Sequence, residues 1–143
     1  MEGVLMNPGT ARRGRGGTQP STEVGSSTKV GAQCHLEKAR VGSTAYIVLI
    51  GELDLSCMKR FGEAFNESVA DRPRDLVLDL RSVTFVDSTG LALLLKVDNF
   101  AREQGIALHM VRSPIEIVQA VFEATGIDKI LPMCDRPPQF QND

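Results

Sequence analysis

The sequence predicts one α/β domain in which a mixed sheet of four to five strands packs with three to four helices. Short apolar runs rich in β-branched residues predict the buried strands. Stretches with apolar residues at helical spacing predict the helices. The two patterns alternate in the second half of the chain, which predicts parallel strands joined by right-handed crossovers. A chain of 143 residues that is 42% hydrophobic has enough apolar side chains for one core.

The first two strands are expected to form a hairpin. Residues 34–36 alternate weakly between apolar and polar types, as an edge strand does, and residues 41–44 are expected to turn. Residues 45–53 form the continuous apolar run AYIVLIGEL, which predicts a buried central strand.

The helices are expected at residues 56–70, at residues 91–104 and from Ser113 onwards. The third helix has the clearest signals: Ser113 is a good N-cap, Pro114 suits the first helical position and Glu116 completes a capping box. Gly105 and Gly126 are expected to end the second and third helices. Further strands are expected at residues 75–80, at 106–111 and, as an optional last strand, at 130–131. The predicted order is therefore β-β-α-β-α-β-α, with an optional final β.

The two ends of the chain are expected to lie outside the domain, which is assigned to residues 31–134. Residues 1–30 are rich in Gly, Arg, Ser and Thr and predict a disordered leader, and residues 135–143 predict a flexible tail. The basic residues near position 12 precede no apolar segment, and no run approaches the ~20 apolar residues that cross a bilayer. The sequence therefore predicts a cytoplasmic protein. A net charge of -2 and 5% aromatic residues argue against nucleic acid or membrane as partners.

The three cysteines, Cys34, Cys57 and Cys134, are far apart and odd in number. This spacing predicts neither a disulfide framework nor a zinc site. Buried thiols in a reducing cytoplasm are the main interpretation. A redox role, with Cys57 and Cys134 as the candidates, is the alternative.

Common catalytic patterns are absent from the sequence. It contains no phosphate-binding G-x-x-x-x-G-K-[ST], no zinc-binding H-E-x-x-H and no nucleophile G-x-S-x-G. The two histidines, His35 and His109, stand far apart in predicted strands. We therefore expect a protein that is not an enzyme, works by binding, and needs neither a cofactor nor a metal.

Residues 85–91, FVDSTGL, stand where a predicted strand gives way to a helix. Asp87 or Ser88 can cap that helix, and Gly90 allows backbone or a partner to approach closely. The helix dipole favours an anion here, so a phosphate on Ser88 would be tolerated by the fold. A partner docked on the same spot would meet a charge of about −1.5 to −2 and be driven away. The alternative is a plain strand-to-helix turn with an ordinary cap.

Asp54 follows the other central strand in the same way, just before a helix. If the two strands are neighbours, Asp54 and Ser88 lie at the same edge of the sheet, where α/β proteins carry their functional groups. Asp54 could then orient the serine hydroxyl or help hold the metal ion of a kinase; its alternative role is to cap the helix near Ser56. The apolar arc of residues 91–104 is wider than one sheet face requires, which predicts a docking surface near Leu93 and Val97, with Leu91 beside the switch.

Several segments together resemble the anti-sigma factor antagonist family with its STAS domain. They are GELD at residues 51–54, LVLDL at 76–80, FVDSTGL at 85–91, Ser113-Pro114, and Phe122, Gly126 and Ile130 at fixed spacing. The resemblance covers residues 31–134 and implies the STAS fold.

The resemblance also implies partner switching. In that family the unphosphorylated protein binds an anti-sigma factor that is itself a serine kinase, and this binding releases a sigma factor. Phosphorylation of the serine after the aspartate, here Ser88, ends the binding, and a PP2C-type phosphatase reverses it. Thr89 is an alternative acceptor, Asp54 matches the other acidic position of the family, and Cys57 stands where a Thr or Ser often opens the first helix.

Three other functions compete with this interpretation. A phosphorelay receiver would use Asp79 as acceptor, but the acidic cluster and the lysine that it needs are not in register. A nucleotide-binding regulatory domain is a second alternative, although the sequence has no phosphate-binding glycine loop. A STAS subunit of a transporter or of a stress-sensing complex is the third.

Overall fold

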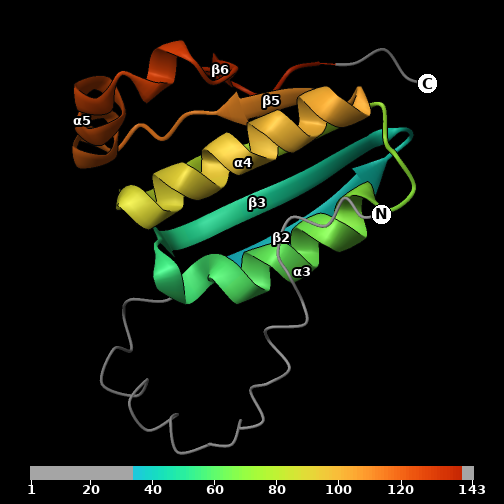
Figure 1. Cartoon of the computed structure of the whole chain (residues 1–143), viewed down its shortest axis with the longest axis horizontal. Helices are drawn as coiled ribbons and strands as arrows, with labels where there is room; N and C mark the ends of the chain where they lie inside the picture. The colour runs from blue at the N-terminus through green and yellow to red at the C-terminus, as the bar shows by residue number, and fades with distance from the viewer. Residues whose placement is uncertain (1–33, 140–143) are drawn as a thin grey trace, which may run out of the picture.

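The computed structural model describes residues 34–139 of the chain. The expected leader, residues 1–30, and the last four residues of the expected tail lie outside this range. Figure 1 shows the described part as one sheet with helices packed along it.

In the described residues the sheet has five strands in the order β2-β3-β4-β5-β6, which confirms the predicted mixed sheet. The strands are β2 (Cys34–Val41), β3 (Thr44–Leu53), β4 (Asp75–Val86), β5 (Ala107–Val111) and β6 (Met133–Cys134). β2 and β3 form the expected antiparallel hairpin, and the pairs β3–β4, β4–β5 and β5–β6 are parallel. The predicted hairpin, edge strand and parallel second half are therefore all confirmed.

Within residues 34–139, three α-helices and two short 3-10 helices follow the strands. They are η1 (Leu55–Cys57), α3 (Met58–Val69), α4 (Ser88–Gln104), α5 (Glu116–Thr125) and η2 (Ile127–Lys129). In Figure 1, α3 and α4 run side by side along one face of the sheet, and α5 lies at the end of the sheet where α4 begins. Phe65 of α3 joins the two long helices, because its ring meets the edge of Phe100 on α4 at a centroid distance of 5.2 Å.

β4 is the central strand, and the side chains of its first six residues, 75–80, are all buried. The strand is twice as long as expected, since it continues from Asp75 to Val86 without a break. β5 pairs with residues 75–79 of it, so among the strands that the structure describes the second half of β4 pairs with β3 alone.

The helix ends agree with the sequence in two places and differ in a third. Gly105 and Gly126 end α4 and α5 in the left-handed conformation, with φ of 72° and 77°, as predicted. The predicted start of the third helix at Ser113 is wrong: α5 begins at Glu116, and its N-cap position, Ile115, makes no side-chain cap. The Ser113 hydroxyl is instead buried, where it donates to Val83 O at 2.9 Å and accepts from Ile115 N at 3.1 Å.

The expected last strand at residues 130–131 is also displaced. The chain after Gly126 turns through η2, and Ile130 is 61% exposed. β6 forms three residues later, at Met133–Cys134, where it pairs with Met110 and Val111 of β5. The apolar character of Ile130 therefore did not indicate a strand.

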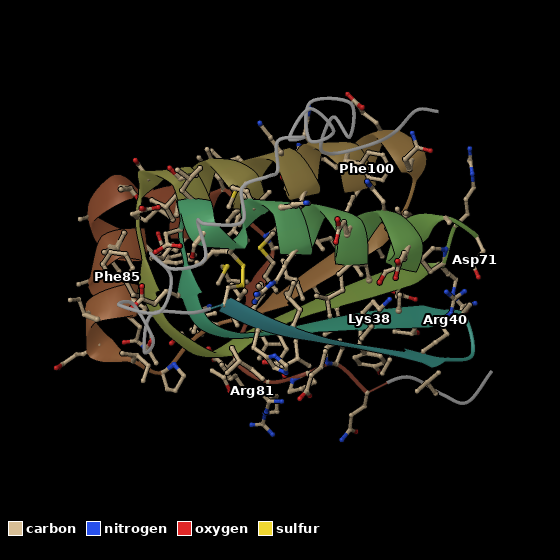
Figure 2. The ribbon with its side chains drawn as sticks, turned by 90° about the horizontal axis from the view of Figure 1, so that it is seen from below. Lys38, Arg40, Asp71, Arg81, Phe85 and Phe100 are labelled. Atoms are coloured by element: carbon tan, nitrogen blue, oxygen red, sulfur yellow. A yellow bond between two sulfur atoms is a disulfide. The ribbon has the colours of Figure 1, made fainter. Side chains whose placement is uncertain are left out.

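Ion pairs join β2 to α3 and to the turn after it, at the end of the molecule far from the start of α4. Lys38 pairs with Glu67, and Arg40 Nη1 lies 2.9 Å from Asp71 Oδ1. Figure 2 shows Lys38, Arg40 and Asp71 together at the right, whereas Phe85 of β4 lies at the opposite end. The charged side chains at this end thus tie the edge strand to the helix above it.

Candidate functional site

The ends of β3 and β4 place two aspartates next to each other. Leu53 and Val86, the last residues of these strands, are partners in the parallel register, and Asp54 and Asp87 follow them directly. The backbone N–H of Asp87 donates to Leu53 O at 3.4 Å, which joins the two strand ends. The prediction that the segments carrying Asp54 and Ser88 end at the same edge of the sheet is confirmed, and Figure 1 shows α3 and α4 starting from this edge.

Asp87 is the N-cap of α4. Its backbone is extended, and its carboxylate Oδ1 accepts a hydrogen bond from the backbone N–H of Gly90 at 3.0 Å. Its own carbonyl accepts the first helical bond, from Leu91 N at 3.0 Å. Of the two caps that the sequence allowed, the structure therefore uses Asp87, and the Ser88 side chain does not fill the cap position.

Gly90 allows the first turn of α4 to touch the end of β3. A Cβ atom at this position would lie 2.2 Å from Leu53 O and 2.9 Å from Leu53 Cγ. The first of these atoms belongs to the backbone of a sheet strand and cannot move aside at small cost. Gly90 is thus required by close packing, as the sequence suggested, and it fixes the start of α4 against β3.

Asp54 caps the turn that follows β3. Its Oδ1 accepts from Ser56 N at 3.0 Å and from the Ser56 hydroxyl at 2.6 Å. The 3-10 turn η1 begins there, and Cys57 N donates to Asp54 O at 2.9 Å. The capping role that the sequence offered as the alternative for Asp54 is therefore the one that its contacts show.

Ser88 is the first residue of α4, and its side chain is exposed. Thr89, the alternative acceptor, follows it and is half-buried. The backbone N–H groups of a first helical turn have no partner within the helix, and the positive end of the helix dipole lies there. The hydroxyl of Ser88 is therefore accessible from solvent at a position that favours a negative charge.

The predicted docking surface on α4 is wrong for its two central residues. Leu93 is 2% exposed and Val97 is fully buried, both within the hydrophobic core, and Leu91 is 8% exposed. The apolar arc is wide because α4 packs on two neighbours, the sheet and α3, as the Phe65–Phe100 contact shows.

Two exposed apolar side chains stand close in sequence to the two aspartates at the strand ends, and the sequence analysis did not single them out. Leu55, directly after Asp54, is 73% exposed, and Phe85, two residues before Asp87, is 40% exposed. Figure 2 shows Phe85 at the end of the molecule where α4 begins. A signal was present in the sequence, since both residues stand beside the two aspartates at strand ends rather than within a helical stripe.

The cysteines differ from the main expectation of free thiols. Cys34 and Cys57 form a disulfide with a Cα–Cα distance of 5.2 Å, so the prediction of no disulfide is wrong. Their 23-residue separation is spanned by the β2–β3 hairpin, in which Cys34 is the register partner of Gly51, and the chain turns back through η1 to Cys57. Of the two redox candidates, Cys57 is thus bonded to Cys34, whereas Cys134 is a free thiol. Cys134 is half-buried on β6, and burial raises the pKa of its thiol.

Within residues 34–139, no group of three or more His, Cys, Asp or Glu side chains is arranged to hold a metal ion. None of the helices in the same range is long and apolar enough to cross a membrane.

Solved structures of anti-sigma factor antagonists have the same fold as this chain. One from Mycobacterium paratuberculosis aligns with a TM-score of 0.60 at 24% identity, covering 73% of this chain and 88% of the other. The antagonist SpoIIAA in its unphosphorylated form aligns with a TM-score of 0.58 at 21% identity, covering 73% and 88%. The phosphorylated form of the Bacillus protein aligns with a TM-score of 0.54. These likenesses establish the fold.

Sequence comparison gives a nearer relative over a shorter stretch and a match to a family. The anti-sigma-F factor antagonist RsfB of Mycobacterium tuberculosis is 44% identical over 50 residues, which are 35% of this chain and 41% of that protein. The alignment thus spans less than half the length of this curated relative. The model of the family described as MlaB, STAS domain, matches residues 36–132. The chain therefore belongs to the STAS domain family.

Proposed function

We propose that this protein is an anti-sigma factor antagonist whose binding is switched off by phosphorylation of Ser88. In its unphosphorylated form it binds an anti-sigma factor that is also a serine kinase, and so releases a sigma factor in the cytoplasm. A PP2C-type phosphatase restores the binding form. The name of the curated relative, an anti-sigma-F factor antagonist, supports the class of partner. The observation that carries the proposal is the exposed Ser88 hydroxyl at the first position of α4.

The surface on which the partner docks surrounds this hydroxyl. We call it the switch surface and define it by Asp54, Leu55, Phe85, Ser88 and Thr89. Exposed apolar side chains beside an accessible polar centre are typical of protein interaction sites, and Leu55 and Phe85 supply them here. This surface takes the place of the one that the sequence analysis expected on α4.

The phosphate acts on the partner and not on the fold. A phosphoserine carries about −1.5 to −2 charges at neutral pH, and at the N-terminus of α4 that charge is favourable. A partner covering the switch surface would have to remove water from this dianion beside the carboxylates of Asp54 and Asp87. Release of the partner therefore needs no large movement of the domain.

The same geometry suits a kinase. The serine is exposed and its backbone is fixed on both sides, by the Asp87 cap and by the contact of Gly90 with Leu53. A fixed and accessible hydroxyl can be presented to the terminal phosphate of ATP without local unfolding. We propose that this chain is the substrate in this step and contributes no catalytic group of its own.

The proposal is tested by incubating the chain with an anti-sigma-F factor and ATP and measuring the intact mass. We expect the addition of one phosphoryl group, which Ser88→Ala abolishes and which the matched neighbouring variant, Thr89→Ala, leaves in place. Transfer of the phosphate to Thr89 in the Ser88→Ala variant would identify the alternative acceptor and contradict the assignment to Ser88.

A binding experiment tests the electrostatic part of the proposal. Ser88→Glu places a negative charge on the switch surface and is expected to weaken binding to the anti-sigma factor by more than about tenfold, since an unpaired buried charge costs several kcal/mol. Ser88→Gln, which has the same shape without the charge, is the control and should bind more tightly than Ser88→Glu. Equal affinity of Ser88→Glu and the unaltered chain would contradict the switch.

A further inference from the structure

The Cys34–Cys57 disulfide, yellow in Figure 2, joins the start of β2 to the turn η1. Both cysteines are buried and belong to the hydrophobic core. Asp54 and Leu55, two residues of the switch surface, stand within three residues before Cys57. The disulfide therefore closes directly beside one side of the switch surface.

The turn η1 is fixed at its two ends by different means. At its start, Leu53 O accepts from Asp87 N at 3.4 Å. At its end, the disulfide holds Cys57 to the start of β2. The hydrogen bonds from Ser56 to the Asp54 carboxylate lie within the turn and do not attach it to the sheet. Breaking the disulfide therefore frees the end of the turn and leaves its start in place.

We expect the domain to keep its fold when the disulfide is open. The carbonyl of Cys34 accepts a hydrogen bond from Arg60 Nη1 of α3, and this contact needs no S–S bond. The buried rings of Phe61 and Phe65 hold α3 in the core. A free thiol packs as a small apolar side chain, so the core accepts the reduced form of both cysteines. The disulfide thus affects the turn more than the fold.

The place of the disulfide also bears on how it is opened. Disulfides in cytoplasmic proteins are in most cases transient and serve catalysis or redox sensing. The sulfur atoms of Cys34 and Cys57 are buried, so exchange with a thiol needs a local opening. In the described residues β2 is an edge strand and Cys34 is its first residue, and strand ends of this kind open at a lower free energy than the core.

We propose that the Cys34–Cys57 disulfide is a reversible redox switch that sets the affinity of the switch surface for its partner. This inference rests on the proposed function, because it concerns regulation of the same surface. In the oxidised form the turn is held, and Asp54 and Leu55 are in place for the partner. In the reduced form the turn is looser, and binding must order it. The redox state and the phosphate on Ser88 then act on two sides of one surface.

The chemistry is a two-electron exchange with a peroxide as oxidant and a dithiol as reductant. One cysteine thiolate attacks the O–O bond of hydrogen peroxide, which gives a sulfenic acid and one water after proton uptake. The second thiol displaces the hydroxyl group as a second water, and the S–S bond forms. In reduction, the two thiols of the dithiol attack in turn, release both cysteine thiols and become a disulfide themselves.

The first test measures whether the disulfide is reversible and coupled to the turn. It uses the whole chain with Cys134→Ser, which leaves Cys34 and Cys57 as its only cysteines. Equilibration with oxidised and reduced dithiothreitol, followed by alkylation and intact mass, should give one two-electron transition with the same midpoint from both directions. Hydrogen exchange at residues 55–57 should be at least about tenfold faster in the reduced form, with that of α4 unchanged.

The second test measures affinity for an anti-sigma-F factor. We expect the reduced form to bind about threefold to tenfold more weakly than the oxidised form, because the partner must order the turn. Cys34→Ser cannot form the disulfide and leaves the sequence of the turn unaltered, so it should match the reduced form and not respond to dithiothreitol. Cys134→Ser in the oxidised form should bind as the unaltered chain does.

Three results would overturn the proposal. A disulfide that stays closed in the folded chain at the most reducing ratio would be a structural link and not a switch. Equal hydrogen exchange of residues 55–57 in the two forms would separate the disulfide from the turn. Equal affinity of the oxidised and reduced forms would overturn this inference alone, whereas binding by neither form would overturn the proposed function together with it.

Discussion

Asp54 after β3 and Asp87 after β4 follow neighbouring parallel strands, and each carboxylate caps the helical turn that comes next. Ser56 stands two residues after its aspartate and donates its hydroxyl to that carboxylate. Ser88 stands one residue after its aspartate and is exposed, while the carboxylate holds the N–H of Gly90. One residue of spacing thus decides whether a strand-end serine is engaged by the cap or presented to solvent.

The two junctions also differ in how they are fixed. The turn after β3 is held covalently, through the disulfide of Cys57 with Cys34 at the start of β2. The start of α4 is held by close packing, through Gly90 against Leu53 O. A covalent link and a steric fit respond to different changes, and this makes the comparison testable.

The largest effect is expected for Gly90→Ala. The new Cβ would overlap Leu53 O, so the start of α4 must move from β3, and we expect the free energy of unfolding to fall by more than about 3 kcal/mol. Gly105→Ala is the matched control at the other end of the helix: no atom lies within 4 Å of its Cβ, and its φ of 72° costs about 1–2 kcal/mol. Urea unfolding measures both. A smaller loss for Gly90→Ala than for Gly105→Ala would show that the packing at the switch is loose.

The next largest effect is expected for Cys57→Ser. Loss of a disulfide that closes a loop of 23 residues lowers the free energy of unfolding by about 3 kcal/mol on chain-entropy grounds. Cys134→Ser, which alters a cysteine outside the disulfide, should change it by less than about 0.5 kcal/mol. Excess dithiothreitol should remove the difference between Cys57→Ser and the unaltered chain. A difference that persists under reduction would have to come from packing.

Removal of the caps compares the two junctions directly. Asp87→Ala takes the cap from a helix of 17 residues and is expected to cost about 1 kcal/mol of unfolding free energy. Asp54→Ala takes the cap from a 3-10 turn of three residues and should cost less, because the disulfide still holds that turn. Thermal unfolding of the two variants gives the order. The reverse order would mean that Asp54 carries more of the structure of this edge than its contacts indicate.

The smallest effect on the free energy of unfolding is expected for Asp79, which lies within β4 and not at its end. Burial of the Asp79 carboxyl raises its pKa, but hydrogen bonds from the side chain and the backbone of Arg81 outweigh burial and hold the pKa below its ordinary value of 3.8. Because the folded-state pKa is the lower one, the ionised group contributes stability above pH 3.8, and that contribution is lost as the pH falls through the folded-state value.

In the Asp79→Asn variant, the free energy of unfolding should therefore fall less steeply as the pH is lowered than it does in the unaltered chain. Urea unfolding of the variant and of the unaltered chain between pH 3 and pH 6 measures this, with the gap in unfolding free energy shrinking toward the lower pH. Glu116→Gln, at an exposed position, is a suitable control. A gap that stays constant with pH would assign the effect to shape and not to charge.

The sequence predicts the start of α4 and the place of Ser88 in its first turn well, because both follow from local rules. An aspartate between a strand and a segment with helical spacing of apolar residues predicts the N-cap of a helix. Ser88, which follows Asp87, must then lie in the first turn of that helix. Because β3 and β4 are parallel neighbours, Asp54 lies at the same edge of the sheet as Ser88. The sequence analysis had to assume only that these two strands pair. The family match over residues 36–132 agrees with the resemblance carried by these segments.

The failed predictions all depend on which neighbours a side chain meets. A helical wheel locates Leu93 and Val97 within an apolar arc but does not say that α3 and the sheet share that arc. The Cys34–Cys57 bond depends on a hairpin register that sequence spacing does not reveal. Ser113 has the sequence of a cap, but its hydroxyl finds a carbonyl of β4 thirty residues earlier in the chain.

The bond from Ser113 to Val83 has a consequence for shortened forms of the domain. β4 is longer than β5, so in the described residues the part of β4 beyond Asp79 has no strand partner on the β5 side. The Ser113 hydroxyl donates to this part of β4 at Val83, between Asp79 and the start of α4 at Ser88. A fragment that stops after α4 would contain every residue of the switch surface and still lack this lateral support. We therefore expect peptides or truncated chains to be poorer substrates of the proposed kinase than the whole domain.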